Sequence, residues 1–274
     1  MRPKAIVFRA ILWWAVSSAC AWAGPAPEPG DRLQSCTGIM PLGDSITVGV
    51  NGGYRNDLYT GLRQDNCGVG YVGTGFDPNT RVADKRHEGH PGLTIADIAS
   101  RADAWMASTS PNIILLMIGT NDTAWWTGEN ADQIGARHNA LVDQIRAARP
   151  NAWIFVASIP PQTSRIIQPN NIDRAVLTQR LDTVIRRNME GRTAAGQRVR
   201  FVDVNSVLKI EDLYDGIHPT EAAHAKVAQK FLESIRAALG PASTPASGKS
   251  SPGGSEGTMT ASDGAAARVR KPEK

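Results

Sequence analysis

The sequence predicts an α/β fold in which helices cover both faces of one parallel sheet. Five short apolar runs recur along the chain, and the segments between them carry apolar residues at helical spacing. Strands that alternate with helices are typical of parallel sheets, because each crossover between parallel strands needs a long connection. The chain shows no internal repeat, so we expect one folded domain.

The expected strands are short, and three of them consist almost entirely of apolar or β-branched residues, as in IILLMI and WIFVASI. Such runs are typical of strands that are buried on both faces of a sheet. The five runs are residues 38–42, 69–73, 112–118, 152–159 and 199–204.

Four segments between and after these runs predict helices, because their apolar residues share one helical face. They are the segment after Thr94 with Ile95, Ile98, Ala102 and Trp105, the segment before Arg149 with Ile134, Leu141 and Ile145, the segment after Asp173 with Val176, Leu181, Val184 and Ile185, and residues 222–239.

The chain has 274 residues and a net charge of +4, but its positive charge lies at the two ends. Residues 1–23 contain three basic and no acidic residues, and residues 241–274 contain five basic and three acidic ones, which leaves the middle with a net charge of −1. The folded domain is therefore not expected to present a basic face, and we predict no nucleic-acid partner.

The first 23 residues have the features of a secretory signal peptide. Basic residues come first, an apolar run follows, and the Ala-Trp-Ala sequence that ends at Ala23 fits the rule for cleavage after that residue. A membrane span is the alternative, but the uncharged stretch ends at Glu28 and contains two prolines, which is short for a span of about 20 residues. We expect a secreted protein without membrane contact after cleavage; a periplasmic location or a lipid anchor on Cys20 is the lesser alternative.

Two cysteines, Cys36 and Cys67, remain after cleavage. In an exported protein they predict one disulfide, which would close a loop of about 30 residues and stabilise the fold by about 3–4 kcal/mol. Two unpaired buried thiols are the alternative.

The ends of the mature chain differ from its middle. We expect residues 24–36 to form a leader segment, residues 37–240 the catalytic domain and residues 241–274 a disordered tail. Of the 34 tail residues, 21 are Ala, Ser, Gly or Pro, and none is Leu, Ile, Phe, Tyr or Trp. Such a segment cannot bury enough apolar area to offset the entropy lost on ordering.

Polar residues suited to nucleophilic catalysis follow the expected strands, where parallel sheets place their sites. Ser45 follows the first strand, Asn121 follows the third, and Asp215 and His218 precede the last helix. A serine becomes a nucleophile when a base lies within reach and a third group orients that base. Because Asp215 and His218 are three residues apart before a proline, we predict that Asp215 orients His218 and that His218 activates Ser45.

Two other motifs carry less weight. Residues 68–73 match a dinucleotide-binding string, but they lie in an expected strand and no helix follows them. His87 and His90 lie three residues apart in a glycine-containing segment, whereas a zinc-protease motif needs a spacing of four on a helix. We therefore predict neither a dinucleotide site nor a metal site.

Four blocks of the chain resemble the GDSL, or SGNH, hydrolases. Residues 39–47 (IMPLGDSIT) resemble the first block, and residues 87–94 (HEGHPGLT) resemble the second, with Gly92 as its glycine. Residues 119–122 (GTND) resemble the third block and residues 215–219 (DGIHP) the fifth. All four blocks occur in order along nearly the whole expected domain.

The longer strings IMPLGDSITVG, GGYRNDLY, GYVGT, HEGHPG and LLMIGTND are similar to the acetylxylan esterases of carbohydrate esterase family three. This resemblance implies a three-layer flavodoxin-like sandwich, with a five-stranded parallel sheet in the order 2-1-3-4-5. It also implies that the enzyme uses no cofactor and that its partner is an acetylated plant polysaccharide. Nothing in the sequence demands more than a monomer.

The chemistry and the resemblance assign the same roles. Ser45 is the expected nucleophile, His218 the base and Asp215 its orienting partner, while the backbone N–H groups of Ser45 and Gly92 and the side-chain amide of Asn121 form the oxyanion hole. We expect Asp44 and Asp122 to be structural. The chain departs from many relatives at Pro91, where they have serine.

Further residues are candidates for contact with the sugar. Trp125 or Trp126 can stack on a sugar ring if the pair lies on a loop at the rim of the site, and His90 and Arg55 can line the site. Packing of the tryptophans and loop hydrogen bonding by the other two are equal alternatives. His138 and His224 lie on expected helices, where we expect surface or packing roles.

The sequence thus predicts a secreted serine esterase that removes O-acetyl groups from plant polysaccharide, most directly acetylxylan, through an acyl-enzyme. A broad short-chain SGNH esterase or lipase, or a deacetylase of cell-wall sugars, is the first alternative. A carbohydrate-binding protein that keeps the scaffold without turnover is the second, and the complete set of catalytic residue types argues against it.

Overall fold

The computed structural model describes residues 36–65, 67–124, 128–167 and 171–240. The predicted signal peptide, the predicted tail and nearly all of the predicted leader lie outside the described residues. The tryptophan pair at positions 125 and 126 also lies outside them.

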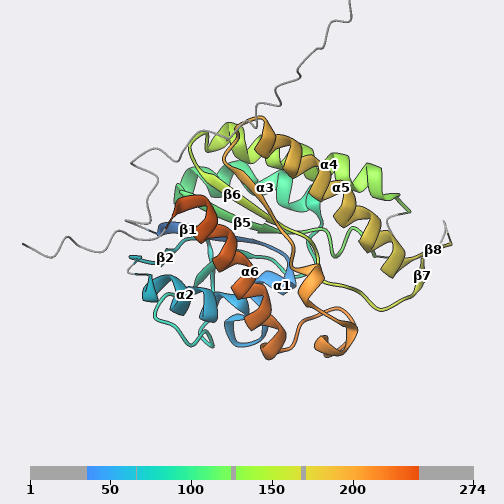
Figure 1. Ribbon diagram of the computed structural model, residues 1–274, viewed down its shortest axis with the longest axis horizontal. Helices are drawn as coiled ribbons and strands as arrows, with labels where there is room; N and C mark the ends of the chain where they lie inside the picture. Colours follow the sequence, from blue (N-terminus) through green and yellow to red (C-terminus); the bar gives the residue numbers. More distant parts are fainter. Residues whose placement is uncertain (1–35, 66, 125–127, 168–170, 241–274) are drawn as a thin grey trace, which may run out of the picture. The chain divides into compact units, whose positions relative to one another are not determined.

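Seven strands form one central sheet that is mostly parallel (Figure 1). β1 (Thr37–Gly43) pairs in parallel with β4 (Arg86–Gly89) on one side and with β5 (Ile113–Met117) on the other. Beyond β5, the sheet continues in parallel through β6 (Trp153–Ala157) to β9 (Val199–Val202). The α/β fold with a parallel core is therefore confirmed.

The predicted count of five strands and the predicted order 2-1-3-4-5 are wrong. The path through the sheet runs β3-β4-β1-β5-β6-β9, and β3 (Gly75–Phe76) pairs antiparallel with β4. β2 (Gly70–Tyr71), from the expected second run, lies off this path and pairs with β1 over two residues. β4 thus occupies the place beside β1 that the prediction gave to the second strand.

β4 could not be recognised as a strand because its sequence, RHEG, contains no apolar run. His87 and Glu88 are nevertheless buried. The Glu88 carboxylate accepts hydrogen bonds from the backbone N–H and the hydroxyl of Thr74, both at 2.7 Å. Because these donors compensate for the loss of water, a polar segment can pair with the central strand.

Helices connect the strands and cover both faces of the sheet. The four predicted helices are present, and two helices that the apolar spacing did not indicate follow β1. The helices are α1 (Ser45–Val48), α2 (Tyr54–Gln64), α3 (Ile95–Thr109), α4 (Ala131–Ala148), α5 (Arg174–Ala194) and α6 (Glu221–Leu239). The shorter elements are β7 (Ile166–Ile167), β8 (Ile172–Asp173), η1 (Val50–Gly52), η2 (Asn205–Val207) and η3 (Ile210–Asp212).

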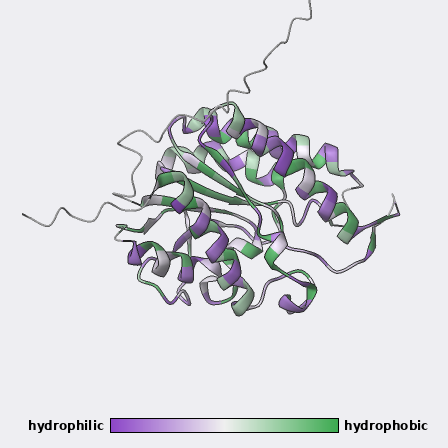
Figure 2. Cartoon of the chain, in the orientation of Figure 1, coloured by the Kyte–Doolittle hydropathy of each residue, from purple (hydrophilic) through white to green (hydrophobic). Residues whose placement is uncertain are grey.

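Two apolar cores flank the sheet. On one face, residues of α2 and α6 such as Leu58 and Phe231 pack with Phe155 of the sheet. On the other face, α3, α4 and α5 pack against the alternate side chains of the same strands. The central strands are accordingly apolar, whereas the helices alternate between polar and apolar residues (Figure 2). Among the described helices, none is both long and apolar enough to cross a membrane.

The predicted disulfide between Cys36 and Cys67 is present, with the two Cα atoms 5.6 Å apart. It joins the residue before β1 to the segment between α2 and β2, and both cysteines are buried. The bridge therefore ties the start of the central strand to the helix layer beside it.

Replacement of both cysteines by alanine should lower the free energy of unfolding by about 3 kcal/mol, because the bridge closes a 31-residue separation in the unfolded chain. Urea denaturation of the wild type and of the Cys36→Ala/Cys67→Ala variant measures this difference. Equal midpoints and equal slopes for the two proteins would contradict the prediction.

Three buried histidines make the stability of the fold depend on pH. Burial lowers the pKa of His87, His138 and His224 to about 4, whereas histidine in an unfolded chain has a pKa of about 6.5. Well above pH 6.5 these groups are neutral in both states, so their ionisation does not change the free energy of unfolding. As the pH falls from 6.5 towards 4, the unfolded chain binds protons that the folded chain excludes, so stability is lost.

His138 allows this effect to be measured away from the sheet edge that carries Ser45. It is fully buried on α4, and its ring nitrogens have no hydrogen-bond partner among the described residues. The His138→Leu variant should lose less stability than the wild type between pH 6.5 and 4.5, by about 2 kcal/mol. Urea denaturation across this pH range tests the prediction, and an unchanged pH dependence would contradict it.

Candidate active site

The register of three neighbouring strands brings the predicted site residues to one edge of the sheet. Gly43, the last residue of β1, is paired with Gly89 of β4 and with Met117 of β5. Ser45 follows Gly43 by two positions, Gly92 follows Gly89 by three, and Asn121 follows Met117 by four. Because the three strands are parallel and in register, all three residues leave the sheet at the same edge.

Ser45 is the first residue of α1, directly after β1. The side chain of Asp44 caps this short helix by accepting a hydrogen bond from the backbone N–H of Ile46 at 2.9 Å. Asp44 is completely buried, and burial raises its pKa to about 6. The carboxyl group therefore fixes the turn that carries Ser45, which agrees with the structural role expected for it.

Ser45, His218 and Asp215 form a continuous chain of hydrogen bonds. The Oγ atom of Ser45 lies 2.8 Å from Nε2 of His218. The Nδ1 atom of the same ring lies 2.7 Å from Oδ2 of Asp215. Ser45 and His218 are separated by 173 positions in the sequence, so this contact depends on the whole fold.

The loop that carries Asp215 and His218 is held by the aspartate itself. Its Oδ1 atom accepts hydrogen bonds from the backbone N–H groups of His218 at 2.8 Å and Ile217 at 3.0 Å. Partial burial raises the pKa of Asp215, but these N–H groups and the His218 ring outweigh burial and hold the pKa below its usual value. Asp215 therefore remains ionised while it holds the His218 ring.

Two hydrogen bonds join the loops that carry Gly92 and Asn121. The Nδ2 atom of Asn121 donates to the carbonyl oxygen of Leu93 at 2.8 Å. The backbone N–H of Ile95 donates to Oδ2 of Asp122 at 3.0 Å. Because an amide nitrogen carries two hydrogens, the bond to Leu93 orients Asn121 and leaves its second N–H for another acceptor. Asp122 thus acts structurally, as expected.

Gly92 has a φ angle of +80°, a conformation that side chains disfavour. A Cβ atom built at this position would meet nothing within 4 Å. Glycine is therefore required here by the backbone conformation and not by lack of space. The preceding residue, Pro91, lines a cavity together with Ser45 and His218, so the Gly92 loop borders the nucleophile.

His90 lies beside this loop, although its contacts are with the protein. Its Nε2 atom lies 2.5 Å from Oε1 of the buried Glu88, and its ring stacks on Trp105 with the centroids 4.5 Å apart. Its backbone N–H donates to the carbonyl oxygen of Gly43 at 2.9 Å. His90 thus anchors the loop to β1. Its ring is partly exposed, so this geometry permits a contact with the sugar, which stays a prediction.

Arg55 is not brought to the rim of the site. Its side chain is 0% exposed, and its guanidinium group binds Asp77 and the carbonyl oxygen of Val48, each at 3.1 Å. A guanidinium group buried in this way cannot contact a polysaccharide, so the prediction that Arg55 lines the site is wrong. The sequence could not reveal this, because an arginine on an amphipathic helix is usually exposed.

Sequence reasoning gave no site role to two residues that lie next to His218. Tyr214 is 59% exposed and stacks on the His218 ring with the centroids 5.7 Å apart. His224, on the first turn of α6, lines the same cavity as Ser45 and His218. Both residues lie close in sequence to the segment from Asp215 to His218, and this closeness could have indicated a role in the site.

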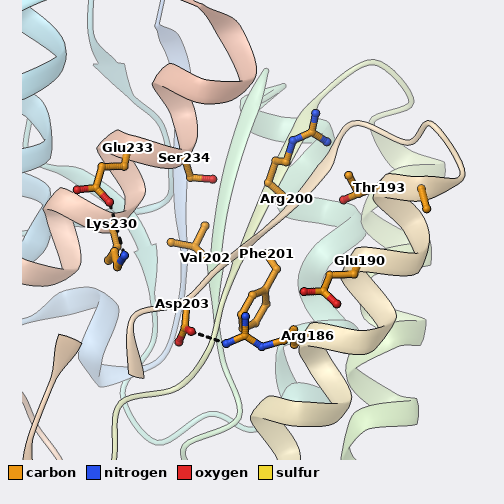
Figure 3. A pocket seen from close by; sticks show the side chains of 11 residues that line it. Arg186, Glu190, Thr193, Arg200, Phe201, Val202, Asp203, Lys230, Glu233 and Ser234 are labelled. Carbon is orange, nitrogen blue, oxygen red and sulfur yellow. Dashed lines mark hydrogen bonds and ion pairs between the residues drawn. The ribbon is translucent and has the colours of Figure 1, made fainter. Parts of the chain in front are cut away.

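The cavity beside Ser45 has a volume of about 190 Å³. A larger cavity of about 640 Å³ lies between α5, β9 and α6, where Arg186 points over Phe201 (Figure 3). None of the predicted site residues within the described part of the chain lines the larger cavity. The described residues also contain no cluster of three or more potential metal ligands.

Comparison with known proteins agrees with this geometry. Residues 42–226 match the model of the GDSL-like lipase/acylhydrolase family. The chain belongs to this family. The predicted membership is confirmed, and with it the predicted class of enzyme, a carboxylic ester hydrolase.

The chain is similar to an esterase in sequence and to two carbohydrate esterases in structure. It is 31% identical over 259 residues to a multidomain esterase of Ruminococcus flavefaciens, covering 81% of the chain and 33% of the relative. A family 3 carbohydrate esterase of Clostridium thermocellum has a TM-score of 0.62 and 30% identity, covering 75% of the chain and all of that structure. A family 3 carbohydrate esterase from Talaromyces cellulolyticus has a TM-score of 0.64 and 26% identity, and the match covers 76% of the chain and 100% of that structure.

The GDSL hydrolase spans about a third of the multidomain esterase that it matches. Both solved structures, in contrast, are covered completely. The residues that match the family model include Ser45, Asp215 and His218.

Proposed function

We propose that the protein is a serine esterase that removes O-acetyl groups from acetylated plant polysaccharide, most directly acetylxylan. The observation that carries this proposal is the hydrogen-bond chain from Ser45 through His218 to Asp215, with distances of 2.8 and 2.7 Å. Both distances lie within the range needed for proton transfer. The reaction proceeds through an acetyl-enzyme.

Acylation begins when the Oγ atom of Ser45 attacks the carbonyl carbon of the acetyl ester. Nε2 of His218 accepts the hydroxyl proton as the new C–O bond forms. The carbonyl oxygen becomes an oxyanion in the tetrahedral intermediate. When the intermediate collapses, His218 returns the proton to the leaving sugar hydroxyl, and the acetyl group stays on Ser45.

Deacylation repeats these steps with water. His218 removes a proton from a water molecule, which attacks the acetyl carbon, and a second tetrahedral intermediate forms. Its collapse breaks the bond to Ser45, returns the proton to Oγ and releases acetate. Asp215 stabilises the imidazolium form of His218 in both halves of the reaction, because its lowered pKa keeps it ionised.

The oxyanion hole that we propose consists of the backbone N–H groups of Ser45 and Gly92 and the side-chain amide of Asn121. The in-register strand ends and the bond from Asn121 to Leu93 support this assignment. Donors that are held in place before the reaction stabilise the developing charge without reorganisation.

The proposed substrate class is supported by the relatives and by the size of the site. Both solved relatives are carbohydrate esterases of family 3. The cavity of about 190 Å³ beside Ser45 accommodates a short acyl group, whereas pockets for larger ligands usually exceed about 300 Å³. We also propose that His90 and the tryptophans at 125 and 126 contact the sugar. The two tryptophans lie outside the described residues.

We further propose that the enzyme is exported by a signal peptide cleaved after Ala23 and acts as a monomer whose catalytic domain is residues 37–240. The disulfide between Cys36 and Cys67 supports an oxidising location. A broad short-chain esterase is the second candidate function, favoured by the match to a family of lipases and acylhydrolases.

Purified protein should release acetate from acetylxylan and should hydrolyse acetate esters much faster than octanoate esters. Acetate release from acetylated xylan, pectin, chitin and peptidoglycan, together with a chromogenic ester series, measures both properties.

Ser45→Ala should lower the rate of ester hydrolysis by about 10⁴-fold or more, and Asp215→Asn should lower it by about 10²- to 10⁴-fold, with the fold intact by circular dichroism. Faster turnover of octanoate than acetate would refute the deacetylase, and an active Ser45→Ala protein would refute the mechanism.

Asn121→Ala should lower kcat by about 10²- to 10³-fold and change KM little, because the lost N–H acts on the oxyanion and not on the ground state. Asn121→Asp is the matched variant of equal size. It should be at least as slow, since it replaces the donor by a carboxylate. If Asn121→Asp retained near wild-type kcat, Asn121 would not donate to the oxyanion.

A further inference from the structure

His224 is a buried histidine beside the nucleophile that the proposed reaction does not use. It lies on the first turn of α6, six residues after His218, and only 1% of its surface is exposed. Its backbone N–H donates to the carbonyl oxygen of Thr220 at 2.9 Å. The helix start therefore fixes the His224 ring relative to the loop that carries His218.

The His224 ring is packed against the backbone of the loop that follows α1. A Cβ atom built on Gly49 would lie 3.0 Å from Nε2 of His224, and one built on Gly53 would lie 3.1 Å from Cε1. Both glycines therefore leave only enough space for the ring. The Tyr54 ring lies near it, with a centroid distance of 6.4 Å. These contacts prevent the His224 ring from moving away from the cavity.

The cavity that His224 lines also contains Ser45 and His218. Its remaining walls are largely apolar and include Val48, Val50 and Pro91. A polysaccharide continues beyond the acetylated sugar in both directions, so the main chain must stay outside a cavity of about 190 Å³. The group that enters an apolar cavity next to the nucleophile is therefore the acyl group.

We propose that the His224 ring closes this acyl pocket and restricts the enzyme to short acyl chains. The inference rests on the proposed function in two respects: Ser45 is the nucleophile, and the alcohol part of the ester is too large to enter the cavity. Chain length is then selected because each additional methylene of the acyl group must displace the wall that the ring forms.

The electrostatic surroundings suit a neutral wall. Burial, together with the positive charge of Arg55 and the nearby His218, lowers the pKa of His224 to about 4. The ring is therefore uncharged at neutral pH, and it does not oppose the positive charge that His218 gains during the reaction. Its Nδ1 atom is buried without a hydrogen-bond partner among the described residues, so no polar contact of that nitrogen explains why a histidine is held here.

The test compares acetate, propionate and butyrate esters of one chromogenic alcohol. His224→Ala should raise the ratio of kcat/KM for butyrate over acetate by about tenfold or more, because one methylene in a confined pocket changes the rate by about that factor. His224→Asn, which removes less of the ring, should raise the ratio by a smaller factor.

His138 provides the matched control, since it is equally buried and its pKa is also lowered to about 4, but it lies on α4. His138→Ala should leave the ratio unchanged. A second arm leaves the buried ring in place: Val50 is 40% exposed and lines the cavity. Val50→Phe should narrow the pocket and lower kcat/KM for propionate relative to acetate by several fold.

The outcomes separate this inference from the proposed function. If His224→Ala and His224→Asn hydrolyse acetate but keep the wild-type ratio, the inference is wrong. If these variants do not fold, Val50→Phe decides: an equal loss for acetate and propionate overturns the inference. A wild type that hydrolyses butyrate as fast as acetate also overturns it. A wild type that prefers acetate esters but releases no acetate from any polysaccharide refutes the proposed substrate alone, and the variants still report on His224.

Discussion

The parallel register of β1 between β4 and β5 is the constraint on which the site depends. Gly43 is paired with both Gly89 and Met117, so the loops after three strands begin at the same level. The bond from Asn121 to Leu93 then locks two of these loops together at 2.8 Å. A shift of one residue in either pairing would reverse the side-chain direction along the strand and move the loops by about 3.3 Å. The short distances around Ser45 could not survive such a shift.

The other half of the site lies more than 160 residues further along the chain, and local hydrogen bonds organise it. Asp215 holds the backbone of Ile217 and His218 as well as the His218 ring. Packing of α6 on the sheet positions this loop, because the apolar face of α6 contributes to the same core as α2 and β1. Long-range packing therefore has to position one loop, in which Asp215 already holds His218, and does not have to place each side chain separately.

The parts of the structure that the sequence predicted are those with a local signal. The long helices and the buried strands have periodic or continuous apolar residues, and the Ser45, His218 and Asp215 motifs have characteristic spacing. β4 has neither signal, because its burial depends on Thr74 supplying hydrogen bonds to Glu88 across the chain. The burial of Arg55 against Asp77 and the placement of His224 beside Ser45 likewise depend on contacts between distant segments. No periodicity within one segment could reveal them.

Two carboxylates adjoin the reacting groups, and their surroundings explain why they have different roles. Asp44 is fully buried next to Ser45, and burial raises its pKa to about 6, while its Oδ1 atom is engaged by the N–H of Ile46. Asp215 is partly exposed, and hydrogen bonds from its own loop hold its pKa low despite partial burial. Only a carboxylate that stays ionised can stabilise a protonated imidazole at little cost. The hydrogen bonds complete the assignment: Asp44 caps α1 through the N–H of Ile46, and Asp215 supports the His218 ring at 2.7 Å, although both aspartates lie within three residues of a reacting side chain.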